Sequence, residues 1–157
     1  MKPARPVMVG VIGAGDCPGD VVELAETLGA EIARRGAVLV CGGLGGVMTA
    51  AARGAKSAGG STVGILPGTA TADANPYIDF PVATGMGQAR NLIIVQTADV
   101  LISVSGSYGT LSEMALALKT GKKVVSLLPR FDVPGLIPAQ NAIEAVDKAL
   151  SLIGAGK

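Results

Sequence analysis

The stretch from Asp99 to Glu113 constrains the fold more than any other part of this sequence. It opens with a short apolar run at Val100–Val104, which has the length of a buried strand. Small residues follow at 105–109, and a helical pattern begins at Thr110. A strand, a small-residue loop and a helix N-terminus together favour an anion, because loop N–H groups and the helix dipole both attract negative charge. We therefore expect a phosphate group here, with Glu113 facing the same ligand from one turn into the helix.

Strand and helix patterns alternate along the rest of the chain. Strands are predicted over residues 6–12, 37–41, 61–66, 78–84, 100–104 and 123–128, with a brief last strand at 136–137. Helices are predicted over 20–35, 47–57, 86–97, 110–120 and 142–153. The alternation predicts the α/β class: a single Rossmann-like domain with a parallel sheet of about six or seven strands and helices on both faces. We place this domain over residues 1–157, with its core at about 6–153.

The composition agrees with such a fold and disfavours several partners. The chain has 157 residues, of which 49% are apolar, and it contains two Tyr, two Phe and no Trp. The core must therefore consist of Val, Ile, Leu and Ala, which suits a parallel sheet covered by helices. A net charge of +1 gives no general attraction for nucleic acid, and few aromatic side chains are present for bases to stack on. We expect no nucleic-acid partner.

The reactive side chains also limit the chemistry. Histidine is absent, which excludes a Ser-His-Asp triad and every zinc site that uses histidine. Cys17 and Cys41 cannot form a four-thiolate site, so we expect no metal and two reduced thiols, as in a cytoplasmic protein. No apolar run reaches the roughly 18 residues that span a bilayer, so we expect a cytoplasmic location and no membrane partner.

Glycine-rich turns follow three of the predicted strands, at Gly13–Gly15, Gly42–Gly46 and Gly106–Gly109. Ligands of parallel α/β sheets bind beyond the carboxyl ends of the strands, so three such turns predict one binding crevice. Each turn taken alone is equally well explained as a tight strand–helix connection. Asp16, beside the first turn, could accept hydrogen bonds from a base, pterin or sugar.

Two common nucleotide sites do not fit this sequence. Gly13 and Gly15 begin a dinucleotide fingerprint, but Pro18 displaces its third glycine, and the second strand does not end in a ribose-binding Asp or Glu. The Gly-x-x-x-x-Gly-Lys-Ser/Thr motif of P-loop NTPases is absent from the sequence. What remains is a crevice for a phosphorylated ligand without the machinery that handles Mg–ATP.

Several short motifs, in their order along the chain, resemble the Lonely guy-like superfamily. They are Cys41–Gly43 with Gly46–Met48, Gly64–Gly68, Ala74–Tyr77, Thr84–Gly87, Ala89–Asn91 and Tyr108–Glu113. The pattern is most similar to the branch of molybdenum cofactor carrier-like proteins, which is distantly related to DNA-processing protein A. The resemblance covers residues 7–150 and implies a Rossmann-like fold, a homodimer or homotetramer, and a pocket of nucleotide or cofactor size.

The resemblance implies, first, a binding protein for a phosphorylated nucleotide or pterin-type ligand. The molybdenum cofactor or a nucleoside monophosphate is then a possible ligand, no cofactor is required, and the loop Gly106–Thr110 holds the phosphate. Arg90 would add a charge-assisted contact. We expect Met48 and Met86 to fill the core or an interface. The ligand-binding candidates are Gly13, Gly15, Asp16, Gly42, Gly43, Gly46, Arg90, Asn91, Gly106, Ser107, Tyr108, Gly109, Thr110 and Glu113.

The alternative is a nucleoside 5′-monophosphate phosphoribohydrolase of the cytokinin-activating Lonely guy type, which cleaves the N-glycosidic bond. Its motif Pro-Gly-Gly-x-Gly-Thr-x-x-Glu and upstream Arg make Glu113 and Arg90 the catalytic candidates. A carboxylate beside the sugar would stabilise the oxocarbenium-like transition state.

This sequence departs from the hydrolase pattern at two places. Val104–Ser107 stands where Pro-Gly-Gly or Gly-Gly-Gly is usual, and Asn91 replaces a typical Lys. Ser107 can replace glycine only where φ is negative. These departures place binding above catalysis and leave open whether the protein is an enzyme. Nothing in the sequence supports the lysine decarboxylase label given to many relatives. A second alternative is a structural or interaction module that has lost its ligand.

Overall fold

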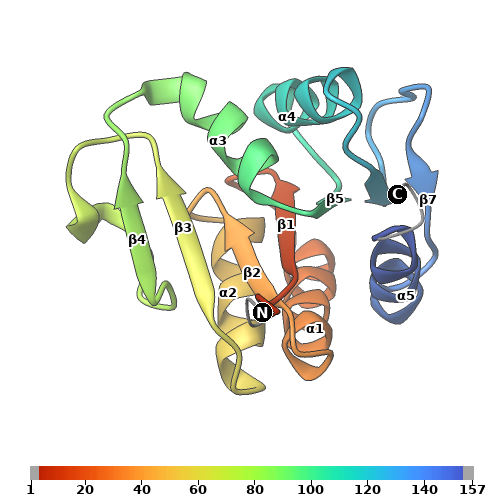
Figure 1. Ribbon diagram of the computed structural model, residues 1–157, viewed down its shortest axis with the longest axis horizontal. Helices are drawn as coiled ribbons and strands as arrows, with labels where there is room; N and C mark the ends of the chain where they lie inside the picture. The colour runs from red at the N-terminus through yellow and green to blue at the C-terminus, as the bar shows by residue number, and fades with distance from the viewer. Residues whose placement is uncertain (1–3, 154–157) are drawn as a thin grey trace.

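The computed structural model describes residues 4–153, which form a seven-stranded parallel sheet in the order β4-β3-β2-β1-β5-β6-β7 (Figure 1). The order reverses at β1, because the chain builds outward to β4 on one side and then returns to place β5 beside β1. The strands are β1 (Met8–Gly13), β2 (Val38–Cys41), β3 (Thr62–Leu66), β4 (Phe80–Ala83), β5 (Val100–Val104), β6 (Val124–Leu127) and β7 (Ile137–Pro138).

Helices cover both faces of the sheet, as the alternating pattern predicted. One face carries α1, α2 and α5, and the other carries α3 and α4 (Figure 1). The predicted fold class is therefore confirmed. The helices are α1 (Gly19–Arg34), α2 (Val47–Ser57), α3 (Arg90–Thr97), α4 (Tyr108–Lys119) and α5 (Ala142–Leu152), with short 3-10 turns η1 (Thr71–Asp73) and η2 (Gly87–Ala89).

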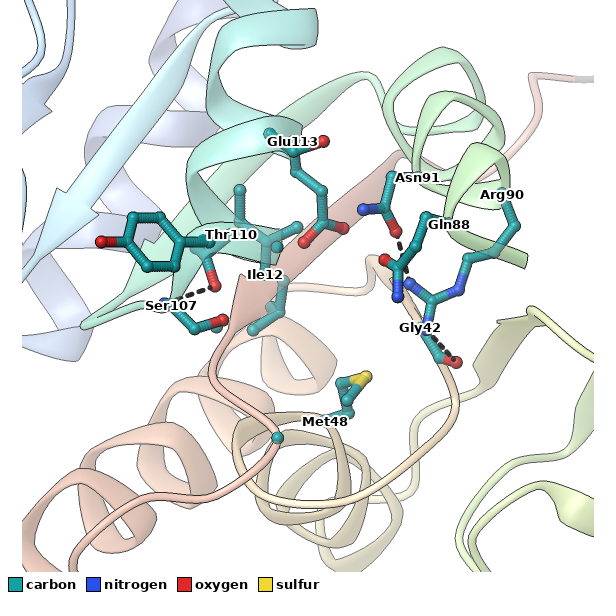
Figure 2. A pocket seen from close by; sticks show the side chains of 15 residues that line it. Ile12, Gly42, Met48, Gln88, Arg90, Asn91, Ser107, Thr110 and Glu113 are labelled. Carbon is teal, nitrogen blue, oxygen red and sulfur yellow. Dashed lines mark hydrogen bonds between the residues drawn. The ribbon is translucent and has the colours of Figure 1, made fainter. Parts of the chain in front are cut away.

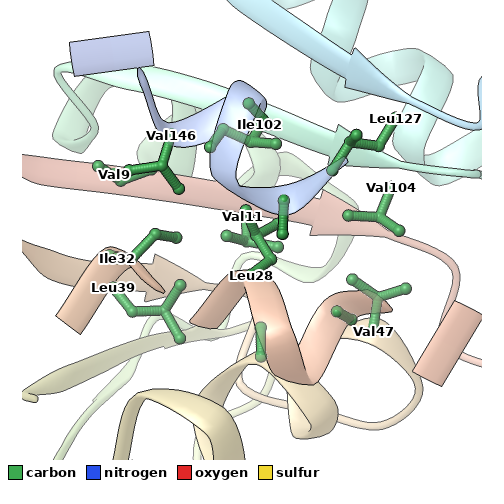
Figure 3. Packing of buried hydrophobic residues seen from close by; sticks show 14 of the residues in the cluster. Val9, Val11, Leu28, Ile32, Leu39, Val47, Ile102, Val104, Leu127 and Val146 are labelled. Atoms are coloured by element: carbon green, nitrogen blue, oxygen red, sulfur yellow. The ribbon is translucent and has the colours of Figure 1, made fainter. Parts of the chain in front are cut away.

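The larger core cluster lies between the central strands and α1, α2 and α5. Val9 and Val11 of β1 pack there with Ile102 of β5, against Leu28 of α1 and Val146 of α5 (Figure 3). Alternate residues of the same strands face α3 and α4, where a second cluster forms. Both faces of the central strands are thus buried beneath helices and excluded from water, which explains their nearly continuous apolar sequence.

Strand ends agree with the sequence predictions to within two residues, and the main difference lies before α3. A helix was predicted over 86–97, but the α-helix begins only at Arg90 and a 3-10 turn precedes it. Gly87 has a φ of +59°, which breaks the α-helical path there. Pro81 predicted an edge position for its strand, and β4 is an edge strand.

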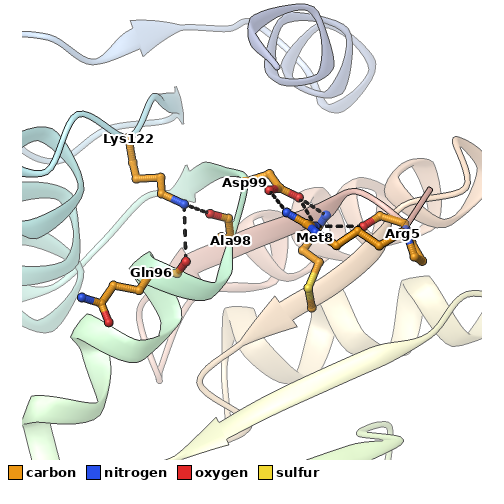
Figure 4. Close-up of polar contacts among 7 residues, drawn as sticks. Arg5, Met8, Gln96, Ala98, Asp99 and Lys122 are labelled. Carbon is orange, nitrogen blue, oxygen red and sulfur yellow. Dashed lines mark hydrogen bonds and ion pairs between the residues drawn. The ribbon is translucent and has the colours of Figure 1, made fainter. Parts of the chain in front are cut away.

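Polar groups at the amino edge of the sheet serve the fold. Asp99 pairs with Arg5 at 2.7 Å and accepts a hydrogen bond from the Met8 N–H at 2.8 Å (Figure 4). The Arg5 hydrogen bond lowers the pKa of Asp99 from its ordinary value. Lys122 donates to the Ala98 carbonyl nearby. These contacts fix the start of β1 beside the start of β5.

Two further searches concern only the part of the chain that the structure describes. None of its helices is long and apolar enough to cross a membrane. Within residues 4–153, no group of three or more Cys, Asp or Glu side chains has the arrangement of a metal site.

Candidate functional site

A cavity of about 560 Å³ opens at the carboxyl edge of the sheet, where β1, β2 and β5 end (Figure 2). This volume falls within the range of small-molecule sites, and the edge is the one at which parallel α/β proteins bind ligands. The lining residues are Val11, Ile12, Gly13, Gly15, Gly42, Met48, Gln88, Arg90, Asn91, Ser107, Tyr108, Gly109, Thr110, Ser112 and Glu113.

The N-terminus of α4 forms one wall of the cavity. Ser107 is the N-cap residue, and its backbone N–H donates to Thr110 Oγ1 at 3.2 Å. Ser107 has a φ of −130°, the negative value that a serine at this position requires. Tyr108 and Gly109 head the helix, where backbone N–H groups have no intrahelical acceptor. This wall therefore presents N–H donors and the positive end of a helix dipole to the cavity.

The turn that leads into α4 is strained. Ser105 has a φ of +53°, one of two such values at non-glycine positions in the described residues. Gly106 follows with a φ of +151°, and a Cβ there would lie 3.2 Å from the Thr110 side chain. Gly106 thus shapes the turn without lining the cavity, and its predicted role reduces to the backbone path that delivers Ser107–Thr110.

Arg90 enters from the opposite wall, at the first residue of α3. It is 8% exposed, donates to Asn91 Oδ1, and reaches the Gly42 carbonyl at 3.4 Å (Figure 2). Its Nε is buried and has no hydrogen-bond partner. Burial lowers the pKa of Arg90, although the nearby Glu113 and Cys41 oppose the shift. The cavity therefore contains a buried cation with an unused donor.

Glu113 lies on α4 with its carboxyl directed into the cavity and is only 7% exposed (Figure 2). Burial raises the pKa of Glu113 to about 8, although the Arg90 charge acts in the opposite direction. Within the described residues the two side chains form no ion pair. The carboxyl is therefore mostly protonated near neutral pH and can donate a hydrogen bond.

The cavity brings together most of the predicted binding residues, namely Gly13, Gly15, Gly42, Arg90, Asn91, Ser107, Tyr108, Gly109, Thr110 and Glu113. Asp16, Gly43, Gly46 and Gly106 lie outside its lining. Asp16 is exposed in the turn before α1. Gly43 and Gly46 have φ values of +77° and +62°, and a Cβ on Gly46 would lie 2.3 Å from the Ala14 carbonyl oxygen. Backbone geometry explains these two glycines.

Sequence reasoning missed part of the lining. We expected Met48 to fill the core or an interface, but Met48 lines the cavity, and a Cβ on Gly42 would lie 2.7 Å from its sulfur. Gln88 also lines the cavity from the 3-10 turn before Arg90. Proximity to Gly46 and to Arg90 in the sequence was the available signal for these two residues.

Comparison with protein families shows to which family this chain belongs. Residues 6–152 match the model of the SLOG cluster4 family. The chain belongs to this family. An uncharacterized protein of Archaeoglobus fulgidus is 49% identical to this SLOG cluster4 protein over 145 residues, covering 92% of this chain and 95% of that protein.

Solved structures of molybdenum cofactor carriers resemble this SLOG cluster4 protein along nearly its whole length. The molybdenum cofactor binding protein of Rippkaea orientalis has a TM-score of 0.90 and 36% identity, covering 96% of this chain and 99% of that one. The molybdenum cofactor carrier protein of Chlamydomonas reinhardtii has a TM-score of 0.85 and 36% identity, with 94% and 98% covered. The predicted resemblance to this group is confirmed.

Two further proteins match this chain less closely, one in sequence and one in fold. The cytokinin riboside 5′-monophosphate phosphoribohydrolase of Mycobacterium tuberculosis is 37% identical over 99 residues, covering 60% of this chain and 52% of that protein. DNA processing protein A of Streptococcus pneumoniae has a TM-score of 0.73 at 19% identity, which indicates a shared fold alone.

Proposed function

We propose that this protein binds a phosphorylated pterin or nucleotide, most specifically the molybdenum cofactor, in the cavity at the carboxyl edge of the sheet. The observation that carries the proposal is the buried Arg90, which lines a cavity that also receives the N-terminus of α4 and which has an unpartnered Nε. Two groups that favour an anion thus line the same cavity. The similarity to molybdenum cofactor carriers over nearly the whole chain supports the same ligand class.

The residues that line the cavity fit such a ligand. The head of α4, from Ser107 to Thr110, would hold the phosphate through backbone N–H groups. Arg90 would balance its charge, and the amides of Asn91 and Gln88 offer hydrogen bonds to the edge of a pterin or base. Ile12 and Met48 supply apolar surface for a flat ring. The molybdenum cofactor supplies redox chemistry through its metal, while this chain would bind, orient and shield it.

The protonation state of Glu113 is consistent with an anionic ligand. A pKa of about 8 leaves the carboxyl mostly neutral at pH 7, so it does not repel a phosphate. A neutral carboxyl can also donate to a ring carbonyl or a phosphate oxygen. Arg90 then remains the dominant charge in the cavity.

Retention of the cofactor tests the proposal. Molybdenum cofactor released anaerobically from a molybdoenzyme would be mixed with the protein, and molybdenum that co-elutes in gel filtration would be measured. We expect retention by the wild type and a roughly tenfold or larger loss of affinity in Arg90→Met, because a charge-assisted contact is removed. Arg34→Met is the matched control, because Arg34 lies on α1 and pairs with Glu31. No retention by the wild type, or equal retention by Arg90→Met, would contradict the proposal.

A second function, N-glycosidic hydrolysis of a nucleoside monophosphate, is favoured by one observation. A neutral, buried Glu113 could protonate a departing base, which no histidine is available to do. Nucleoside 5′-monophosphates, including cytokinin forms, would be incubated with the protein and free base measured by chromatography. Release that disappears in Glu113→Gln supports the hydrolase, whereas binding without release supports the carrier.

A further inference from the structure

A second cavity, of about 450 Å³, lies on the other side of the loop that leads into α4. Its lining includes Ser126, Arg130, Phe131 and Asp132, together with apolar residues such as Val133 and Leu136. Arg130 Nη1 donates to the Gly106 carbonyl at 3.4 Å. The Phe131 ring lies 6.0 Å from the ring of Tyr108, which lines the first cavity. The two cavities therefore flank one loop, and each is lined by one of two neighbouring aromatic side chains, Tyr108 in the first and Phe131 in the second.

Ser126 provides an independent indication of a ligand in the second cavity. The residue is 2% exposed, and its hydroxyl is buried without a hydrogen-bond partner. It is paired across the sheet with Ser103, whose buried hydroxyl also has no partner, and Ser103 is paired with Ile12 of the first cavity. A row of residues thus leads across three strands from one cavity to the other. Buried hydroxyls are normally hydrogen-bonded, so an unpartnered one at a cavity wall indicates a polar occupant.

We propose that the second cavity binds the second nucleoside of a dinucleotide-type ligand, one whose phosphate groups link two ring-bearing arms. The phosphates would lie at the head of α4 and the first arm in the cavity that contains Arg90. This inference rests on the proposed function, because the phosphate site is the same. A phosphomonoester ends at the loop, whereas a pyrophosphate or phosphodiester continues past it.

The side chains of the second cavity suit a nucleoside arm. Phe131 lines this cavity, and Tyr108 of the first cavity lies beside it with its ring inclined at 36°, so both offer faces on which a flat base can stack. Arg130 adds a cation beside the linking phosphates, from a position that already contacts the loop. Ser126 and Asp132 provide a hydroxyl and a carboxylate for the polar edge of a base.

Matched probe pairs test the inference. FMN and FAD share a flavin phosphate, and AMP and diadenosine 5′,5′-diphosphate share an adenosine phosphate; only the second member of each pair carries another nucleoside. Calorimetry on the full chain should give a dissociation constant roughly tenfold lower for a two-armed probe, since base stacking is worth about 1–3 kcal/mol. Phe131→Ala should remove this gain and leave the affinity for FMN and AMP unchanged. Phe80→Ala is the control, because Phe80 is the only other phenylalanine and lies on edge strand β4.

Ser126→Ala separates a ligand contact from a structural role. Removing an unpartnered buried hydroxyl should leave the ligand-free protein as stable as the wild type or more stable. The same change should weaken two-armed probes severalfold without affecting one-armed probes. A structural role for Ser126 predicts the opposite sign, a loss of stability with no selective loss of binding.

The outcomes separate this inference from the proposed function. Equal affinity within both pairs, or a two-armed gain that persists in Phe131→Ala, overturns the second subsite and leaves the first cavity intact. Failure of all four probes to bind also overturns the subsite, while retention of the molybdenum cofactor tests the first cavity independently.

Discussion

Two loops of this protein have the same local design and different structural roles. The loop after β2, at 42–46, leads into α2, and the loop after β5, at 105–107, leads into α4; both are short, contain small residues and precede a helix. The start of α2 is closed, because the Val47 N–H donates to the Ala14 carbonyl at 3.0 Å and the first turn packs against the chain after β1. The start of α4 opens onto the cavity.

The difference shows that a helix N-terminus is accessible to a ligand only where its neighbours leave it open. The helix dipole is present at both helices, but at α2 another segment of backbone takes the place of a ligand. The loop after β2 contributes by another route: its Gly42 carbonyl accepts from Arg90 at 3.4 Å. A Cβ at Gly42 would lie 2.8 Å from Arg90 Nη2, so glycine permits this approach. One loop thus positions the cation, and the other presents the N–H donors.

The largest expected effect comes from adding a methyl group to the closed loop. Gly46→Ala should destabilise the protein by about 3 kcal/mol or more, because its Cβ would lie 2.3 Å from a carbonyl oxygen and its φ is +62°. Urea unfolding measures the change. Gly109→Ala in the first turn of α4, which opens onto the cavity, is the control, because a Cβ there meets only Ser107 Oγ, at 3.8 Å. Its stability should match or exceed that of the wild type by up to about 1 kcal/mol. Similar losses in both variants would contradict the distinction between the loops.

A second prediction concerns Glu113, a buried ionisable side chain of α4 that has no counterpart in α2. Glu113 is the sixth residue of α4, and Ala52 has the corresponding position in α2. Between pH 4.5 and about 8, unfolded Glu113 loses its proton while folded Glu113 keeps it. The folded state then binds more protons, so wild-type stability falls as pH rises through this window. Glu113→Gln should therefore gain in relative stability by as much as about 1.4 kcal/mol per pH unit there, and no further outside it.

Urea unfolding across this pH range measures the Glu113 effect. Asp99→Asn at the amino edge is a control of opposite sign, because Arg5 lowers the pKa of Asp99 and its stabilisation is lost as pH falls. A stability difference between Glu113→Gln and wild type that does not vary with pH would rule out a buried, protonated Glu113.

The third prediction concerns binding at the open loop. Ionisation of Glu113 above about pH 8 places a negative charge in the cavity, so a phosphorylated probe such as FMN should bind roughly tenfold more weakly at pH 9 than at pH 7. Glu113→Gln should show no such decrease, because its side chain does not titrate. Calorimetry at the two pH values tests this, and a parallel decrease in both proteins would assign the effect to another group.

The smallest expected effect concerns strain in the open loop. The loop after β2 has glycine at its positive-φ positions, 43 and 46, whereas the loop after β5 has a serine at φ +53°. Ser105→Gly should relieve left-handed strain and stabilise the protein by up to about 1 kcal/mol. Thermal unfolding measures the shift. A clear loss of stability would indicate that the Ser105 side chain makes a contact that outweighs its backbone strain.

Much of the architecture was predictable because it depends on local patterns. The apolar period located the strands and helices, Pro81 indicated an edge, and the negative φ required at Ser107 is observed. The predicted start of α3 was wrong because Gly87 adopts a positive φ. Glycine permits such a value but does not require it, so the sequence did not indicate the break. Met48 and Gln88 were missed because their place in the cavity wall depends on segments that pack beside them.

The sequence by itself determined the α/β alternation and the small-residue turns, and its motifs indicated Arg90 and Glu113 as candidate site residues. Only the tertiary structure decided which turn stays open, that both side chains are buried without pairing, and that a second cavity adjoins the first. The physical reason is the distance along the chain over which each effect acts. Periodicity and turn preferences act between neighbouring residues, whereas accessibility and desolvation depend on groups that are distant in the chain and meet only on folding.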